Sequence, residues 1–148
     1  MGTRKIIKLV ILLIWLYLIF YLSNQPADIS SLESKGLFSR VLTFFNIDPI
    51  LHNPLHNMAR EFMHFFEYFI LGFILYTNVK EYKIDNKYFV TISLAFLYSV
   101  SDEIHQVFVP GRTFEYLDIS LDLLGIILSA LIIIIIYNKK NVCITKKM

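Results

Sequence analysis

Residues 116–137 read YLDISLDLLGIILSALIIIIIY, and this apolar run is long enough to cross a lipid bilayer as a single helix. The hydrocarbon core of a bilayer is about 30 Å thick, so a helix rising about 1.5 Å per residue needs about 20 residues to span it. Three more segments have this character, which gives expected spans at residues 6–22, 62–79, 88–109 and 116–137. The sequence therefore predicts an all-α membrane protein with four transmembrane helices in a bundle.

The composition supports the same fold class. The chain has 148 residues, of which 56% are hydrophobic and 18% are charged, whereas a soluble domain carries about 25% charged residues. We expect residues 1–148 to form one membrane domain. A net charge of +2 gives no indication of nucleic-acid binding. The single cysteine, Cys143, excludes a disulfide framework and a zinc site built from four cysteines.

The distribution of basic residues predicts the orientation. Most of the Lys and Arg residues fall in three segments that alternate with the expected spans, and the cytoplasmic side of a membrane protein is enriched in such residues. These residues are Arg4, Lys5, Lys8, Lys80, Lys83, Lys87, Lys139, Lys140, Lys146 and Lys147. Both termini are therefore expected in the cytoplasm. The first span is long and aromatic-rich with no A-x-A-like site after it, so we interpret it as a retained anchor.

The first outer loop, residues 23–57, contains a second helical signal. Apolar side chains repeat at helical spacing from Leu37 to Phe45, which predicts a short amphipathic helix. Such a helix lies either on the outer leaflet or against the bundle, and the pattern does not choose between them. Asn53 and Pro54 are typical of an N-cap and a first helical residue, so the helix of the second span is expected to begin there.

The helices of the second, third and fourth spans carry ionisable residues toward their outer ends, although a charge within a membrane helix is costly. Arg60, His64, Glu67 and Tyr68 share one face of the second span, and Asp118, Asp122 and Gly125 share one face of the fourth. Counting along the helices puts these groups at one depth, just below the outer surface. The catalytic candidates are His64, Glu67, Asp102, Glu103 and His105, and the expected substrate-binding residues are Arg60, Tyr68, Gln106, Arg112, Asp118 and Asp122.

Several chemical interpretations of this cluster are open. His64-x-x-Glu67 and Glu103-x-His105 offer ligand types for a metal, but neither is a complete zinc motif. A His with a carboxylate also suits general acid–base catalysis. In a purely structural network, Arg60 and Arg112 pair with two of the acids. The carboxylates outnumber these arginines, so the excess must be protonated, hydrated or bound to a cation. The neighbours Asp102 and Glu103 lie about 100° apart on a helix. We therefore expect one of them to meet His64 or Glu67, and the other to meet Asp122 or Arg112.

Two strings resemble the motifs of a known family. SDEIHQVFVPGRTFEYLDISLDLLG at residues 101–125 and REFMHFFEYFILG at residues 60–72 resemble the signatures of the VanZ-like integral membrane proteins. Ser23-Asn24-Gln25, after the first span, is similar to a further S-x-Q element of that family. Residues 113–116, Thr-Phe-Glu-Tyr, are bulkier than the small polar stretch expected there, so the ligand admitted by this loop is expected to differ.

The resemblance implies a role at the bacterial cell envelope, because the family is named for a protein linked to resistance to the glycopeptide teicoplanin. On this basis we expect a multi-pass protein of the bacterial inner membrane with a polar pocket near the outer leaflet. Its partners would be the lipid bilayer and a peptidoglycan precursor, another envelope lipid or the antibiotic. The alternatives are a membrane-embedded hydrolase or transferase, with or without a metal, and a structural membrane subunit. The sequence assigns no cofactor and leaves catalysis open.

Overall fold

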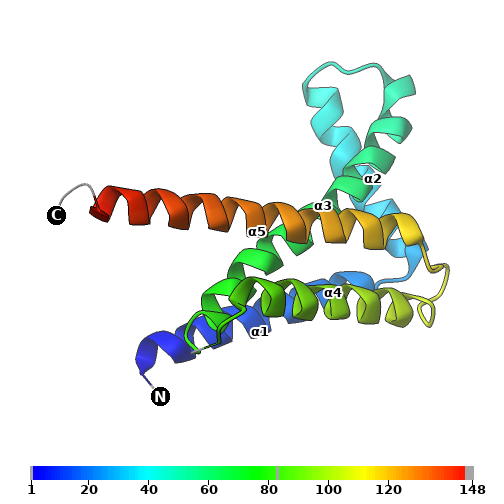
Figure 1. Cartoon of the computed structure of the whole chain (residues 1–148). Coiled ribbons are helices and arrows are strands. Elements are labelled where there is room, and N and C mark those ends of the chain that lie inside the picture. The colour runs from blue at the N-terminus through cyan, green and yellow to red at the C-terminus, as the bar shows by residue number, and fades with distance from the viewer. Residues whose placement is uncertain (1, 83, 146–148) are drawn as a thin grey trace.

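A computed structural model describes residues 2–82 and 84–145 of the chain, and these residues form helices and connecting turns. The helices are α1 (Thr3–Ser23), α2 (Ala27–Phe44), α3 (His52–Val79), α4 (Lys87–Gln106) and α5 (Tyr116–Thr145), and a short 3-10 turn, η1 (Pro49–Leu51), leads into α3. Figure 1 shows α2 and the first turns of α3 projecting from the other helices. Lys83, Lys146 and Lys147 lie outside the described residues, and the side chains of Lys139, Lys140 and Cys143 are not described either.

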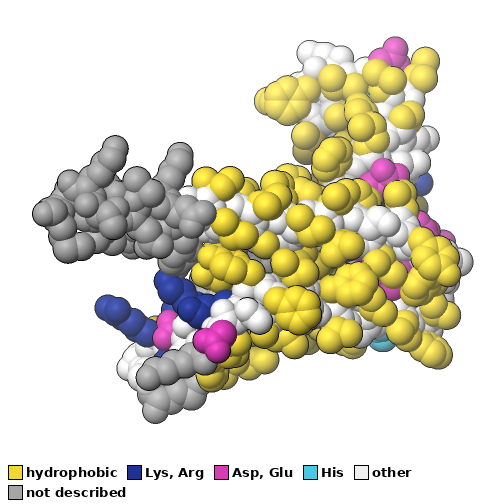
Figure 2. All heavy atoms as spheres, in the orientation of Figure 1, with side chains coloured by type: hydrophobic (Ala, Val, Ile, Leu, Met, Phe, Trp, Pro, Cys, Tyr) yellow, Lys and Arg dark blue, Asp and Glu magenta, His cyan; other side chains and the backbone are white. Residues whose placement is uncertain are grey.

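Three helical segments are long and apolar enough to cross a membrane. They are Thr3–Ser23, Pro49–Val79 and Tyr116–Ile136. Helix α4 corresponds to the remaining expected span. It is not among these three segments, because the polar residues of its last two turns lower its mean hydropathy. Large hydrophobic side chains are exposed along the helices, for example Ile14 at 61% and Leu97 at 63%, and Figure 2 shows them covering much of the visible face. Such faces suit contact with lipid tails rather than water.

The helix boundaries correct several expectations. Helix α4 ends at Gln106 rather than at residue 109, because the chain tightens into i→i+3 turns before Pro110 and Gly111, whose φ is 77°. Helix α3 begins at His52, so Asn53 is not its N-cap. Asp48 caps the preceding 3-10 turn instead, accepting from the backbone N–H of Ile50 at 2.9 Å.

Helices α2 and α5 are longer than the sequence indicated. Helix α2 has 18 residues rather than one short amphipathic stretch, and it begins directly after Pro26. Its Phe38 ring packs edge-on against His56 of α3, with the ring centroids 5.9 Å apart. Leu37 and Phe44 nevertheless remain largely exposed. Helix α5 continues past residue 137 to Thr145.

Each end of the bundle has its own polar contact between segments that are distant in the sequence. At one end, Lys8 of α1 forms an ion pair with Glu81, which follows α3, and this contact lowers the pKa of the Glu81 carboxyl. At the other end, the Ala27 N–H donates to the Pro110 carbonyl at 3.1 Å, joining the start of α2 to the loop after α4. The N-terminus and the α3–α4 turn thus share one end of the molecule (Figure 1).

Helices α3 and α5 approach each other closely because both carry glycine where they touch. A Cβ atom on Gly125 would lie 2.3 Å from the backbone oxygen of Phe65, and one on Gly72 would lie 2.0 Å from the Ser129 hydroxyl. Small residues permit such close packing between membrane helices. A buried apolar cluster, formed by Leu12, Ile19, Tyr68, Leu71, Ala95 and Ile126, extends this contact to α1 and α4.

We predict that Gly125→Ala destabilises the protein, because the new methyl group would collide with the backbone of α3 rather than with a movable side chain. Overpacking of this kind costs about 1–3 kcal/mol, and a lowered thermal midpoint in detergent would report it. Gly36→Ala is the matched control, since a Cβ there meets nothing within 4 Å. A Gly125→Ala variant that melts at the wild-type temperature would show that α3 and α5 are not in this contact.

Candidate functional site

Ionisable side chains from α3 and α5 meet near the end of the bundle that holds the α4–α5 loop. His64 of α3 lies between two carboxylates of α5. Its Nε2 is 3.4 Å from Oδ2 of Asp118, and its Nδ1 is 3.7 Å from Oδ1 of Asp122. The sequence assigned these residues to facing stripes on two helices, and the glycine contact between α3 and α5 brings the stripes together.

Two carboxylates of this region are held by serine hydroxyls. Ser99 of α4 donates to Oδ2 of Asp122 at 2.6 Å, and Ser23 at the end of α1 donates to Oδ2 of Asp102 at 2.7 Å. Asp102 also accepts from the side-chain amide of Gln106 at 3.2 Å. Ser23 and Ser99 were not among the predicted site residues. The available signals were the position of Ser23 directly after an apolar run and that of Ser99 on the polar side of α4. These bonds link helices, as a structural network would.

Glu103 is placed differently from its neighbour Asp102. Its side chain is 1% exposed, and its Oε2 accepts the backbone N–H of Glu115 at 3.1 Å. Asp102 therefore bonds to α1 and Glu103 bonds to the loop before α5. The two acids have different partners, but among the described residues their hydrogen bonds are not to the expected His64, Glu67, Asp122 or Arg112. The other oxygen of Glu103, Oε1, is buried without a hydrogen-bond partner among the described residues.

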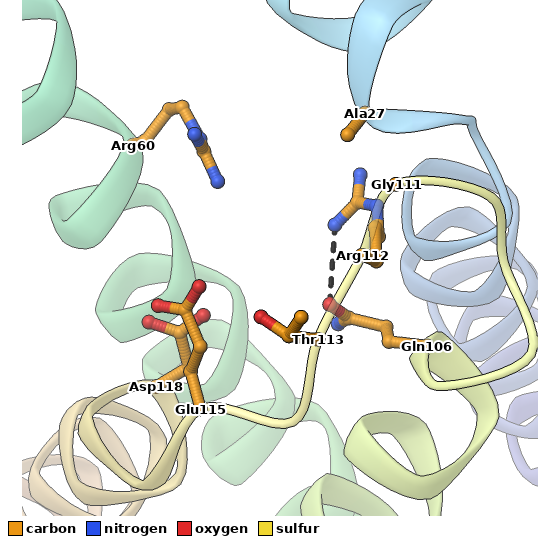
Figure 3. A pocket seen from close by; sticks show the side chains of 8 residues that line it. All are labelled: Ala27, Arg60, Gln106, Gly111, Arg112, Thr113, Glu115 and Asp118. Carbon is orange, nitrogen blue, oxygen red and sulfur yellow. Dashed lines mark hydrogen bonds between the residues drawn. The ribbon is translucent and has the colours of Figure 1, made fainter.

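Two arginines enter one polar pocket from opposite sides, as Figure 3 shows. Arg112 donates from its guanidinium to three neutral acceptors: the carbonyl of Gln25 at 3.0 Å, the carbonyl of Leu22 at 3.2 Å and Oε1 of Gln106 at 3.2 Å. Partial burial lowers the pKa of Arg112, and the positive charge of Arg60 acts in the same direction. The pairing of these arginines with acids, which a purely structural network would use, is not found within the described part of the chain, where the ion pairs involve Lys8 and His64 instead.

Arg60 lines four cavities, and three of them also include other predicted site residues. One of about 140 Å³ includes Arg112, Gln106 and Asp118 in its lining. A second, of about 180 Å³, is bordered by His64, Glu67 and Arg112. The third, of about 210 Å³, is bordered by His64, Glu61 and Asp118. Of the predicted substrate-binding residues, Arg60, Gln106, Arg112 and Asp118 thus line a cavity directly.

Two other candidates, His105 and Tyr68, line none of these cavities. His105 faces α1, where its Nε2 is 3.2 Å from Oδ1 of Asn24 and its ring lies 4.8 Å from that of Phe20. Tyr68 is fully buried in the apolar cluster. The structure therefore does not group possible metal ligands in the predicted pairs, His64 with Glu67 and Glu103 with His105. Among the described residues, ligand atoms of His64, Glu103 and Asp118 gather within 4.8 Å of one another.

Apolar helices with a cluster of buried carboxylates at one end define the chain as a helical membrane protein with a polar interior. A family model described as VanZ/LLP1 matches residues 8–137, and the chain belongs to this VanZ-like family. No curated protein and no solved structure gives a significant match. The family assignment made from residues 60–72 and 101–125 is thereby confirmed.

We predict that Ser99→Ala lowers the stability of the protein, because it leaves Oδ2 of Asp122 buried without its hydroxyl donor. The loss of a partner by a buried polar group costs about 1–3 kcal/mol. Thermal unfolding in detergent measures the change. Ser101→Ala provides the control, since Ser101 is exposed and bonds only within its own helix, to the Tyr98 carbonyl at 2.7 Å. If both variants melt alike, the Ser99–Asp122 bond contributes nothing measurable.

Proposed function

We propose that this VanZ-like membrane protein binds a cell-envelope lipid through an anionic head group, seated between Arg60 and Arg112 at the outer surface of a bacterial inner membrane. The observation that carries the proposal is the pair of guanidinium groups at one pocket, neither bonded to a carboxylate among the described residues. Arginine matches phosphate and carboxylate geometry through paired donors and stays charged at neutral pH.

The proposed topology has cytoplasmic termini and four spans, in which α4 crosses the membrane in addition to the three most apolar segments. The ion pair of Lys8 with Glu81 supports an inner end that holds both the N-terminus and the α3–α4 turn. Basic residues on either side of that pair follow the charge bias of cytoplasmic loops. The opposite end, with the α4–α5 loop and Arg112, would then face outward.

The mixed lining of the pocket narrows the class of ligand. Glu115 and Asp118 border the same cavity as the two arginines, so a head group that carries hydrogen-bond donors beside its anionic group would satisfy both. A lipid-linked peptidoglycan precursor has this chemistry, because phosphates and sugar hydroxyls occur together in it. Binding such a precursor would also account for a connection between this family and glycopeptides such as teicoplanin.

A lipid-binding measurement tests the proposal. Purified protein should bind a short-chain polyprenyl phosphate, and the matching polyprenol, which lacks the phosphate, should bind at least about tenfold more weakly. A hydrogen bond to a charged group contributes about 1.5–3 kcal/mol, so Arg60→Gln should lower the affinity for the phosphate by about tenfold or more.

The control is Arg40→Gln, because Arg40 is an exposed arginine on α2 and should be neutral in this assay. Native mass spectrometry of the protein in detergent would report each affinity. Equal binding of the phosphate and the alcohol, or undiminished binding by Arg60→Gln, would contradict the proposal.

A further inference from the structure

Three ligand atoms of suitable types gather beside the arginine pocket. They belong to His64 of α3, Glu103 of α4 and Asp118 at the start of α5, and all lie within 4.8 Å of one another. Glu103 is 1% exposed and Asp118 is 8% exposed. Because three separate helices each contribute one ligand, the arrangement depends on the tertiary fold.

Unpartnered atoms at this position provide a second observation. Oε1 of Glu103 and Nδ1 of His64 are buried, and neither has a hydrogen-bond partner within the described residues. Oδ1 of Asp122, which lies 3.7 Å from Nδ1 of His64, is buried and unpartnered as well. Buried polar atoms are normally paired, so the unpartnered Oε1 of Glu103 leaves a buried acceptor free beside His64 and Asp118.

The charge balance indicates a cation. Neither Arg60 nor Arg112 forms an ion pair with these acids among the described residues, and the guanidinium of Arg112 donates to neutral acceptors. Carboxylates that face one another in a buried site repel unless a proton or a cation lies between them. A lone imidazole supplies at most one charge to Asp118 and Asp122 together.

We propose that His64, Glu103 and Asp118 form a binding site for one divalent transition-metal ion. One imidazole with two carboxylates suits Zn²⁺ or Mn²⁺. Zinc–ligand bonds of about 2.0–2.2 Å place tetrahedral ligands about 3.4 Å apart. The ligand atoms lie within 4.8 Å of one another, so the side chains need to close by at most about 1.4 Å. Three protein ligands leave a fourth position open to water or to a ligand, as in catalytic zinc sites.

The cation has a route into the site. His64 and Asp118 both border a cavity of about 210 Å³ that Arg60 and Glu61 also line. An ion held there would lie next to the proposed anion pocket, but its binding does not require a lipid. The metal-site proposal and the lipid-binding proposal can therefore be tested independently.

Metal analysis of the full-length protein tests the inference directly. Protein with the Cys143→Ser substitution, stripped with chelator and dialysed against Zn²⁺ alone, should retain one zinc per chain. His64→Ala, Glu103→Gln and Asp118→Asn should each lower the affinity for Zn²⁺ at least about tenfold. Circular dichroism and size-exclusion chromatography identify any variant that fails to fold. If His64→Ala fails to fold, the isosteric variants Glu103→Gln and Asp118→Asn still test the proposal.

His105→Ala and Glu67→Gln are the controls, because these residues lie near the site but outside the group of three ligands. Both should keep stoichiometric zinc. The absence of stoichiometric zinc from the parent protein, or equal zinc affinity in the parent and all three ligand variants, would overturn the proposal. Since no lipid is present in this assay, its failure would leave the lipid-binding measurement unaffected.

Discussion

The close contact between α3 and α5 is the constraint on which the rest of the structure depends. Gly72 and Gly125 let the helix backbones approach until neither position has room for a methyl group. At this distance His64 reaches the carboxylates of Asp118 and Asp122 on the facing helix. A wider separation would leave those acids facing lipid or α4 alone, where isolated charges are costly. The same glycines thus determine both the packing and the position of the polar residues.

The polar residues divide into two groups with different surroundings. Asp102 and Asp122 accept short hydrogen bonds from Ser23 and Ser99, and these bonds connect α1 and α5 to α4. In the second group, Arg60 forms no ion pair among the described residues, and Nδ1 of His64 and Oε1 of Glu103 have no hydrogen-bond partner there. The first group explains how the membrane helices hold their register. The side chains of the second group are therefore available to bind a ligand.

The sequence predicted the helices and the facing stripes because hydrophobic length and helical spacing are local properties. It also predicted the family from two uninterrupted motifs, and the family match confirms that assignment. It failed where the answer depends on contacts between distant segments. His105 turns toward Asn24 of the α1–α2 link, and Arg112 bonds to carbonyls of the same region rather than to an acid. Backbone carbonyls carry no sequence signature, so such partners emerge only from the fold.

The central claim is that the polar site opens on the outside of the membrane, and cysteine labelling tests it most directly. Single cysteines at Lys35, Asn86 and Glu115, all exposed positions, would be introduced with Cys143→Ser and treated with an impermeant maleimide on intact cells. The account predicts labelling at Lys35→Cys in α2 and at Glu115→Cys beside the pocket, with Asn86→Cys labelled only after permeabilisation. Labelling of Asn86→Cys on intact cells, with Glu115→Cys protected, would contradict it.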